Sequence, residues 1–193
     1  MKSAQILIAF LFLILFSSCQ RKSEPGDHNH NKAANTEPQA DTIKKSIPKE
    51  EHAQIGDAHA MIKYHAPTVR GRTIWGGLVP YGEVWVTGAH SATSFEIDKD
   101  FVVNDQKIPA GKYALFTIPD KESWTIIINK NWEQHLADDY DQKDDILRIT
   151  VKPEYTNENQ ERLKYTLVPS ANSEGMVQIR WEKVAVEMPF KVK

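Results

Sequence analysis

The stretch YALFTIPDKESWTIII, residues 113–128, contains two short apolar runs separated by a polar turn. The first run, 113–118, is apolar at most successive positions and stops at Pro119. A run of this length that is apolar on both faces is typical of a central strand covered on both sides. The second run, 124–128, has the same character. We therefore predict two buried strands joined by a turn.

The chain on either side of this stretch also has the pattern of strands. Apolar and polar residues alternate, or apolar runs end at turn signals, in further segments: 94–98, 101–103, 147–152, 163–167, 177–182 and 184–188. Asn104-Asp105 is a turn signal that predicts a hairpin after residue 103. A helical period is absent from the sequence, except for a turn around 131–138. About eight to ten strands predict an all-β domain, an antiparallel β-sandwich or jelly-roll-like fold.

Residues 67–93, PTVRGRTIWGGLVPYGEVWVTGAHSAT, are the part of the chain richest in glycine, aromatic residues and histidine. Glycine at this density indicates sharp turns, so the segment is expected to be tightly turned against the strands. Its arginines either bind a carboxylate or phosphate or pair with a buried acid. Its aromatic residues either fill the core or stack on a sugar. The candidate ligand-binding residues are Arg70, Arg72, Tyr81, Trp85 and Thr87.

The N-terminus has the pattern of an export signal. Lys2 precedes an apolar stretch, 6–16, and Ser17-Ser18 precede Cys19. This resembles a bacterial lipoprotein signal, which implies cleavage after residue 18 and a lipid anchor on Cys19. An ordinary secretory signal and an uncleaved anchor are the alternatives. The resemblance places the protein in the cell envelope, and Gln20 is compatible with the outer membrane.

Residues 19–60 are predicted to form a flexible tether, which leaves 61–193 as a single domain. The tether has no aromatic residue and few apolar ones, so it cannot bury enough surface to offset ordering. His28 and His30, together with His52 and His59, either chelate a transition metal loosely or are incidental. Cys19 is the only cysteine, so the domain cannot contain a disulfide.

Charge and motif content argue against several classes of function. Lys and Arg number 24 against 26 Asp and Glu, and no basic cluster stands out, so nucleic acid is not an expected partner. The sequence has no G-x-S-x-G turn for a nucleophilic serine. The acidic run 138–145 lacks the glycine and the closing glutamate of an EF-hand loop. A binding module is therefore ranked above an enzyme.

Several separated motifs resemble those of the DUF2911 family, a bacterial domain of unknown function common in exported Bacteroidetes proteins. They are R-G-R (70–72), G-G-L-V-P-Y-G (76–82), W-V-T-G-A (85–89), A-T (92–93), P-A-G-K-Y-A-L-F-T-I-P (109–119) and W-T-I-I (124–127). The resemblance covers about residues 61–190 and implies an exported β-rich domain, with no activity attached. The chain departs from the family pattern at three histidines, His65, His90 and His135. At the position of His90 the family usually has asparagine. Val86 replaces an arginine of the family.

The three departures suggest a metal site. Imidazoles are good ligands for zinc and copper, and three nitrogens with an open position are a common metal geometry. Asp138, close behind His135, is a candidate fourth ligand or an acceptor that fixes a tautomer. These histidines are far apart in sequence, so only the fold can bring them together, and unconnected surface histidines are the alternative.

The sequence thus predicts a lipid-anchored envelope protein whose β domain binds a small ligand or a transition metal. A metal-dependent hydrolase that uses the same three histidines is the second hypothesis. A lipoprotein with a structural or protein-binding role is the third. The protein partner and the ligand are not defined by the sequence.

Overall fold

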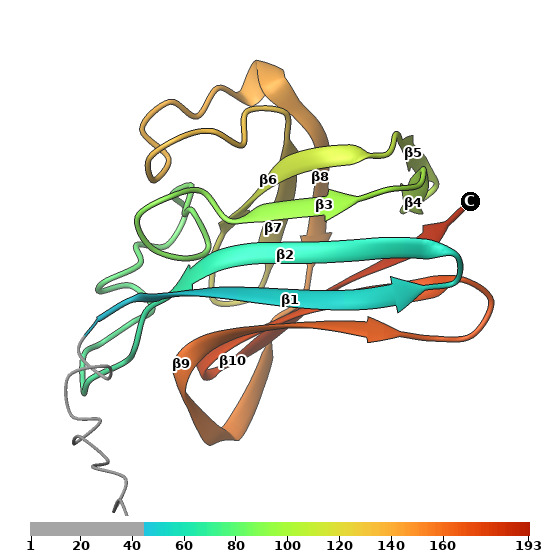
Figure 1. Cartoon of the computed structure of the whole chain (residues 1–193). Coiled ribbons are helices and arrows are strands. Elements are labelled where there is room, and N and C mark those ends of the chain that lie inside the picture. Colours follow the sequence, from blue (N-terminus) through green and yellow to red (C-terminus); the bar gives the residue numbers. More distant parts are fainter. Residues whose placement is uncertain (1–44) are drawn as a thin grey trace, which may run out of the picture. The chain divides into compact units, whose positions relative to one another are not determined.

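The computed structural model describes residues 45–193, so the predicted signal, the predicted lipidation site Cys19, and His28 and His30 lie outside the described residues. This part of the chain contains ten strands, one short 3₁₀ turn and no α-helix (Figure 1). The elements are β1 (Ile47–Ile55), β2 (Ala58–Ala66), β3 (Ser94–Ile97), β4 (Phe101–Val103), β5 (Gln106–Ile108), β6 (Gly111–Ile118), β7 (Trp124–Asn129), η2 (Gln142–Asp144), β8 (Asp145–Val151), β9 (Glu154–Pro169) and β10 (Glu174–Val192). The all-β prediction is confirmed.

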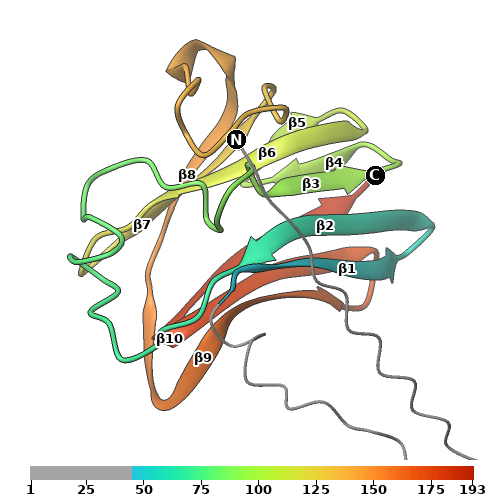
Figure 2. The ribbon, with the colours of Figure 1, turned by 60° about the vertical axis from the view of Figure 1, so that its left-hand side comes forward.

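The strands form two antiparallel sheets. One has the order β1-β2-β3-β6-β7-β8, and the other has the order β5-β4-β10-β9. Figures 1 and 2 show β9 and β10 below β1 and β2, and the main core contains residues of both sheets, so the two sheets pack against each other. This arrangement is the antiparallel sandwich expected from the strand pattern.

The main core fills the space between the two sheets, and four tryptophans cluster in it or against it. Trp124 and Trp181 are only 2% and 1% exposed. The ring of Trp75 lies edge-on to both of them, at centroid distances of 4.9 and 5.8 Å. Trp85 stacks on Trp181 at 5.6 Å. The glycine-rich segment 67–93 thus contributes two of its aromatic residues to the core rather than to a sugar-binding platform.

The predicted pair of buried strands is confirmed as β6 and β7. β6 lies between β3 and β7 in the sheet, and Leu115 on one of its faces is fully buried in the main core. Phe116, on the opposite face, is also fully buried. It belongs to a second, smaller cluster that we call the outer core: Val86, Ala92, Ala114, Phe116 and Ile127.

The predicted boundary at residues 60–61 is wrong. β1 and the first three residues of β2 lie within 19–60, the segment assigned to the tether. The two strands form a hairpin in which every residue of β1 pairs with one of β2. β1 looks like a linker because one of its faces is polar and exposed, and because it is an edge strand with few apolar residues. The turn at Gly56-Asp57, where Gly56 has a φ of +61°, is the signal that reveals the hairpin.

Two other local expectations change. The runs 177–182 and 184–188 belong to one strand, β10, whose pairing with β9 shifts register around Glu182. Glu182 has a φ of +54°, as a bulge residue in a bent strand can have. Among residues 45–193, no helix is long and apolar enough to cross a membrane.

Candidate functional site: a histidine-lined cleft

The six-stranded sheet has an outer face, which points away from the four-stranded sheet, and two loops cover only half of it. Over β6 and β7, the loops 84–92 and 130–141 bury the outer core. Over β1, β2 and β3 the same face stays open to solvent. We call this open part the bare half: Glu50, His52, His59, Met61, Lys63, His65 and Glu96.

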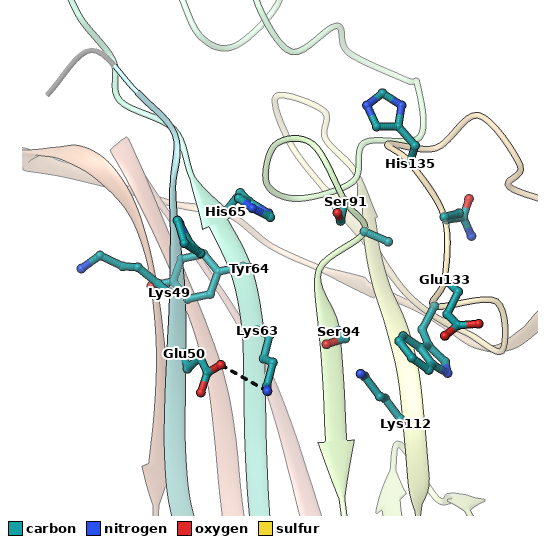
Figure 3. A pocket seen from close by; sticks show the side chains of 14 residues that line it. Lys49, Glu50, Lys63, Tyr64, His65, Ser91, Ser94, Lys112, Glu133 and His135 are labelled. Atoms are coloured by element: carbon teal, nitrogen blue, oxygen red, sulfur yellow. Dashed lines mark ion pairs between the residues drawn. The ribbon is translucent and has the colours of Figure 1, made fainter. Parts of the chain in front are cut away.

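A cleft of about 510 Å³ lies where the covering loops stop and the bare half begins (Figure 3). β1, β2, β3 and β6 provide its floor, and the two loops provide a wall. We call it the histidine cleft. Its lining is Pro48, Lys49, Glu50, Lys63, Tyr64, His65, Ser91, Ala92, Ser94, Lys112, Trp132, Glu133, Gln134 and His135.

Backbone hydrogen bonds fix the wall of the cleft. The N–H of Ala92 donates to the carbonyl of Gln134 at 3.0 Å, and the N–H of Leu136 donates to the carbonyl of His90 at 2.6 Å. His90 and Leu136 both have positive φ, +64° and +50°. This backbone conformation is uncommon for residues other than glycine, and it persists only where surrounding contacts hold it. The two loops therefore form one braced unit beside the cleft.

His65 and His90, two of the three predicted metal ligands, come together at this edge. His65 projects from β2 toward the cleft, and its ring meets that of His90 edge-to-face, with the centroids 5.2 Å apart. Burial lowers the pKa of His65, and repulsion from His90 lowers it further. The imidazole of His65 is therefore held toward its neutral form, which is the form that accepts a proton or a metal ion.

His135 does not join that pair. Figure 3 shows His65 and His135 on opposite sides of the cleft. Nδ1 of His135 lies 3.1 Å from Oδ2 of Asp138, and both side chains are largely exposed. Within the part of the chain that the structure describes, no three His, Cys, Asp or Glu side chains are placed to hold one metal ion. The fold therefore assembles two of the predicted ligands, while His135 pairs with Asp138 in its own loop.

Lysine and serine side chains make up the floor of the cleft. Lys63 lies directly across from Ser94 in the β2–β3 register, and Lys112 follows from β6. Nζ of Lys63 is 3.2 Å from Glu50, and Nζ of Lys112 lies 3.5 Å from the ring centre of Trp132. Sequence analysis missed these lysines because no local cluster marks them. The alternation of polar residues along β2 was the available signal.

The candidate ligand-binding arginines lie elsewhere. Arg70, Arg72 and Trp85 line a separate hollow of about 370 Å³, together with Leu78 and Trp181. The guanidinium of Arg72 donates to the backbone carbonyls of its own turn, Thr68 and Val69, and the backbone N–H of Arg70 donates to Glu161 at 2.8 Å. These contacts are structural.

Tyr81 and Thr87 do not line that hollow. The ring of Tyr81 lies near Gly76 and below Lys121, whose Nζ is 5.9 Å from the ring centre. Thr87 is fully buried, and its hydroxyl lies 2.9 Å from that of Thr117. The five candidate ligand residues are therefore spread over three environments.

The fold and site define an antiparallel β-sandwich with a polar, histidine-edged cleft on its larger sheet. Residues 46–190 match the model of the family described as "Protein of unknown function (DUF2911)", and the chain belongs to this family. The match begins just before β1, in agreement with the corrected boundary of the domain. No curated protein and no solved structure matches the chain.

Proposed function

We propose that the protein is a binding module of the cell envelope, held at a membrane by lipid on Cys19, that takes a small anionic ligand in the histidine cleft. The cleft itself is the observation that carries this proposal. Its volume of about 510 Å³ is in the range of small-molecule sites. Its walls are braced by backbone hydrogen bonds, so the site is formed before a ligand arrives.

The charges in the cleft favour an anion. The charged side chains of the lining are three lysines and two glutamates, and His65 and His135 add ring nitrogens. Figure 3 shows the side chains of Lys63 and Lys112 on either side of Ser94, above the floor. Two ammonium groups and a hydroxyl can donate several hydrogen bonds to one carboxylate or phosphate group.

In this proposal, the carboxylate of Glu50 competes with the ligand for Lys63. It accepts from Lys63, and this hydrogen bond is the main reason why the pKa of Glu50 lies below its ordinary value. A ligand anion that takes over Lys63 must displace the Glu50 carboxylate. A surface ion pair of this kind is weak, so the displacement costs little.

Calorimetric titration of the full chain in detergent with inorganic phosphate, glucose 6-phosphate and glucose tests the site. We expect the two anions to bind and uncharged glucose not to bind. Lys112→Ala should weaken anion binding at least tenfold, whereas Lys164→Ala, at an exposed position of β9, should leave it unchanged. Equal binding of glucose and its phosphate, or full affinity in Lys112→Ala, contradicts an anion site.

The anchor is tested separately. With Cys19→Ala we expect loss of fatty-acid labelling in a bacterial host and a shift of the protein from the membrane to the soluble fraction. Cys19 is the only cysteine, so the variant disturbs no other thiol. Continued labelling of Cys19→Ala would contradict acylation at this position.

A transition metal, zinc or copper, bound by His65, His90 and His135 stays a prediction, and so does hydrolysis at such a centre. The contact between His65 and His90 supports the first two ligands. The third requires His135 to leave Asp138 and swing across the cleft. Zinc titration of His135→Ala tests the third ligand when His28, His30, His52 and His59 are also replaced by Ala, because unchanged stoichiometric binding would then remove His135 from the site.

A further inference from the structure

A second pair of imidazoles lies on the bare half, away from the histidine cleft. His52 on β1 and His59 on β2 project from the exposed face of the hairpin. Nδ1 of His52 lies 3.3 Å from Nε2 of His59, and the ring centroids are 5.3 Å apart with an angle of 31° between the planes. The two nitrogens therefore lie at hydrogen-bond distance from each other.

This separation fits a shared metal ion. An ion bound at about 2.0–2.1 Å by two imidazole nitrogens in tetrahedral geometry holds those nitrogens roughly 3.3 Å apart. The pair differs from His65 and His90, whose rings meet edge-to-face at an angle of 82°. A small rotation of the exposed side chains of His52 and His59 directs both lone pairs to an ion.

Met61 supplies a third donor on the same face. It is the cross-strand partner of His52, and it lies two residues after His59 on β2. Successive side chains of a strand alternate between faces, so His59 and Met61 point the same way, and directly opposed residues lie side by side. His52, His59 and Met61 thus form a triangle of two nitrogens and one sulfur.

The donor set selects the metal. Thioether sulfur is a soft ligand that favours Cu(I), and imidazole also binds copper well. From these contacts we propose that His52, His59 and Met61 form a copper(I) site on the β1–β2 hairpin. The site shares only Glu50 with the anion cleft, because that carboxylate contacts both His52 and Lys63.

Neighbouring groups support the site. Oε2 of Glu50 lies 3.3 Å from Nε2 of His52, so the carboxylate can accept from that nitrogen and leave Nδ1 free for the ion. The backbone N–H of His59 donates to Asp98 at 2.8 Å, which fixes the start of β2. His59 and Met61 also line a hollow of about 370 Å³, which leaves room for a further ligand of the ion.

Copper(I) titration of the full chain under a reducing agent, against a coloured copper(I) chelator, tests the proposal. His28→Ala and His30→Ala are introduced throughout, so that the N-terminal histidines do not compete. We expect one copper ion per chain. His52→Ala and His59→Ala should each weaken binding at least tenfold, and His65→Ala is the matched control that should not.

Met61→Leu separates the copper site from a general two-histidine site. It should weaken copper(I) binding at least tenfold and leave zinc binding unchanged, and the ε-methyl NMR signal of Met61 should shift only when copper is added. All three side chains lie on the bare half, so an unchanged melting temperature will show that the variants fold. Absence of copper binding, full binding in His52→Ala or Met61→Leu, or its loss in His65→Ala each overturns the proposal.

Discussion

The two halves of one sheet face are built for different purposes. Over β6 and β7, the outer face is apolar and sealed by loops, so that Phe116 and Ile127 are completely buried. Over β1 and β2, the equivalent positions are mostly polar or histidine and are exposed or half-buried. The histidine cleft lies at the border between them, where the loops provide a rigid wall and the bare strands provide reactive side chains.

This difference between the two halves shows where binding groups can be placed without loss of stability. The inner face of the hairpin carries Ile55, Ala58, Ala60 and Ile62, all fully buried in the main core. The outer face of the same strands contributes nothing to that core. Imidazoles and lysines there can serve a ligand, because they are not part of the packed main core.

The sharpest test of this contrast is truncation on each half. Phe116→Ala should destabilise the domain by about 3–5 kcal/mol, since it removes a fully buried ring that packs on Tyr140. Met61→Ala, on the same face over the bare half, should cost less than about 1 kcal/mol. Urea denaturation measures both. Equal losses of unfolding free energy in the two variants would show that the side chain of Met61 is also packed in the folded protein.

Sequence reasoning predicted the covered half well and the bare half poorly. The runs at β6 and β7 are apolar at nearly every position because both faces are buried, and such runs are hard to misread. β1 exposes one face and an edge, so Ile47, Ala53 and Ile55 alone carry its strand signal. Composition therefore favours a linker for this segment, and only the turn signal at Gly56-Asp57 points to a hairpin.

The candidate site shows a similar limit. His65 and His90 were selected as departures from a family pattern, and the fold does bring their rings together. Asp138 is a candidate acceptor for His135 from its place three residues behind it, whereas the position of His135 across the cleft from His65 depends on a loop conformation that no spacing encodes. Lys63 and Lys112 are 49 positions apart and become neighbours only because β3 lies between β2 and β6. Such contacts are properties of sheet order.

We expect a smaller loss of stability when the hydrogen bonds between the loop 130–141 and β8 are weakened. The hydroxyl of Tyr140 donates to Asp145 at 2.7 Å and accepts from Arg148 at 2.8 Å. Burial is the main cause that raises the pKa of Tyr140 to about 12, and the hydrogen bond to Asp145 adds to it. Tyr140→Phe should cost about 0.5–1.5 kcal/mol, measured by urea denaturation at pH 7.

The stability of the protein at alkaline pH tests the same hydrogen bond between Tyr140 and Asp145. The folded pKa of Tyr140 is raised, so its contribution is fully present below the unfolded pKa of about 10 and is lost as the pH rises through 12. The wild-type protein should therefore lose stability between about pH 10 and 12 more steeply than Tyr140→Phe. Parallel curves for the two proteins would show that the phenol titrates normally.

A still smaller effect is expected in acid, at the border of the two halves. The pKa of His65 is lowered, so its contribution to stability is present above the unfolded pKa of about 6.5 and is lost as the pH falls. His90→Asn removes the neighbouring charge, and asparagine tolerates the positive φ at this position. By NMR titration, the pKa of His65 should rise in His90→Asn. A pKa that stays unchanged would leave burial as the whole cause.

The smallest change in stability is expected for the exposed ion pair between Glu50 and Lys63, on the bare half. Both side chains are about half exposed, so solvent screens their attraction. Glu50→Gln should leave the melting temperature unchanged, because no packed contact is lost. The same change frees Lys63 and should tighten phosphate binding in the histidine cleft, as measured by calorimetry. A lower melting temperature of Glu50→Gln with unaltered phosphate binding would contradict this. Glu50 would then be a structural residue of the hairpin, and the bare half would contribute to stability despite its exposure.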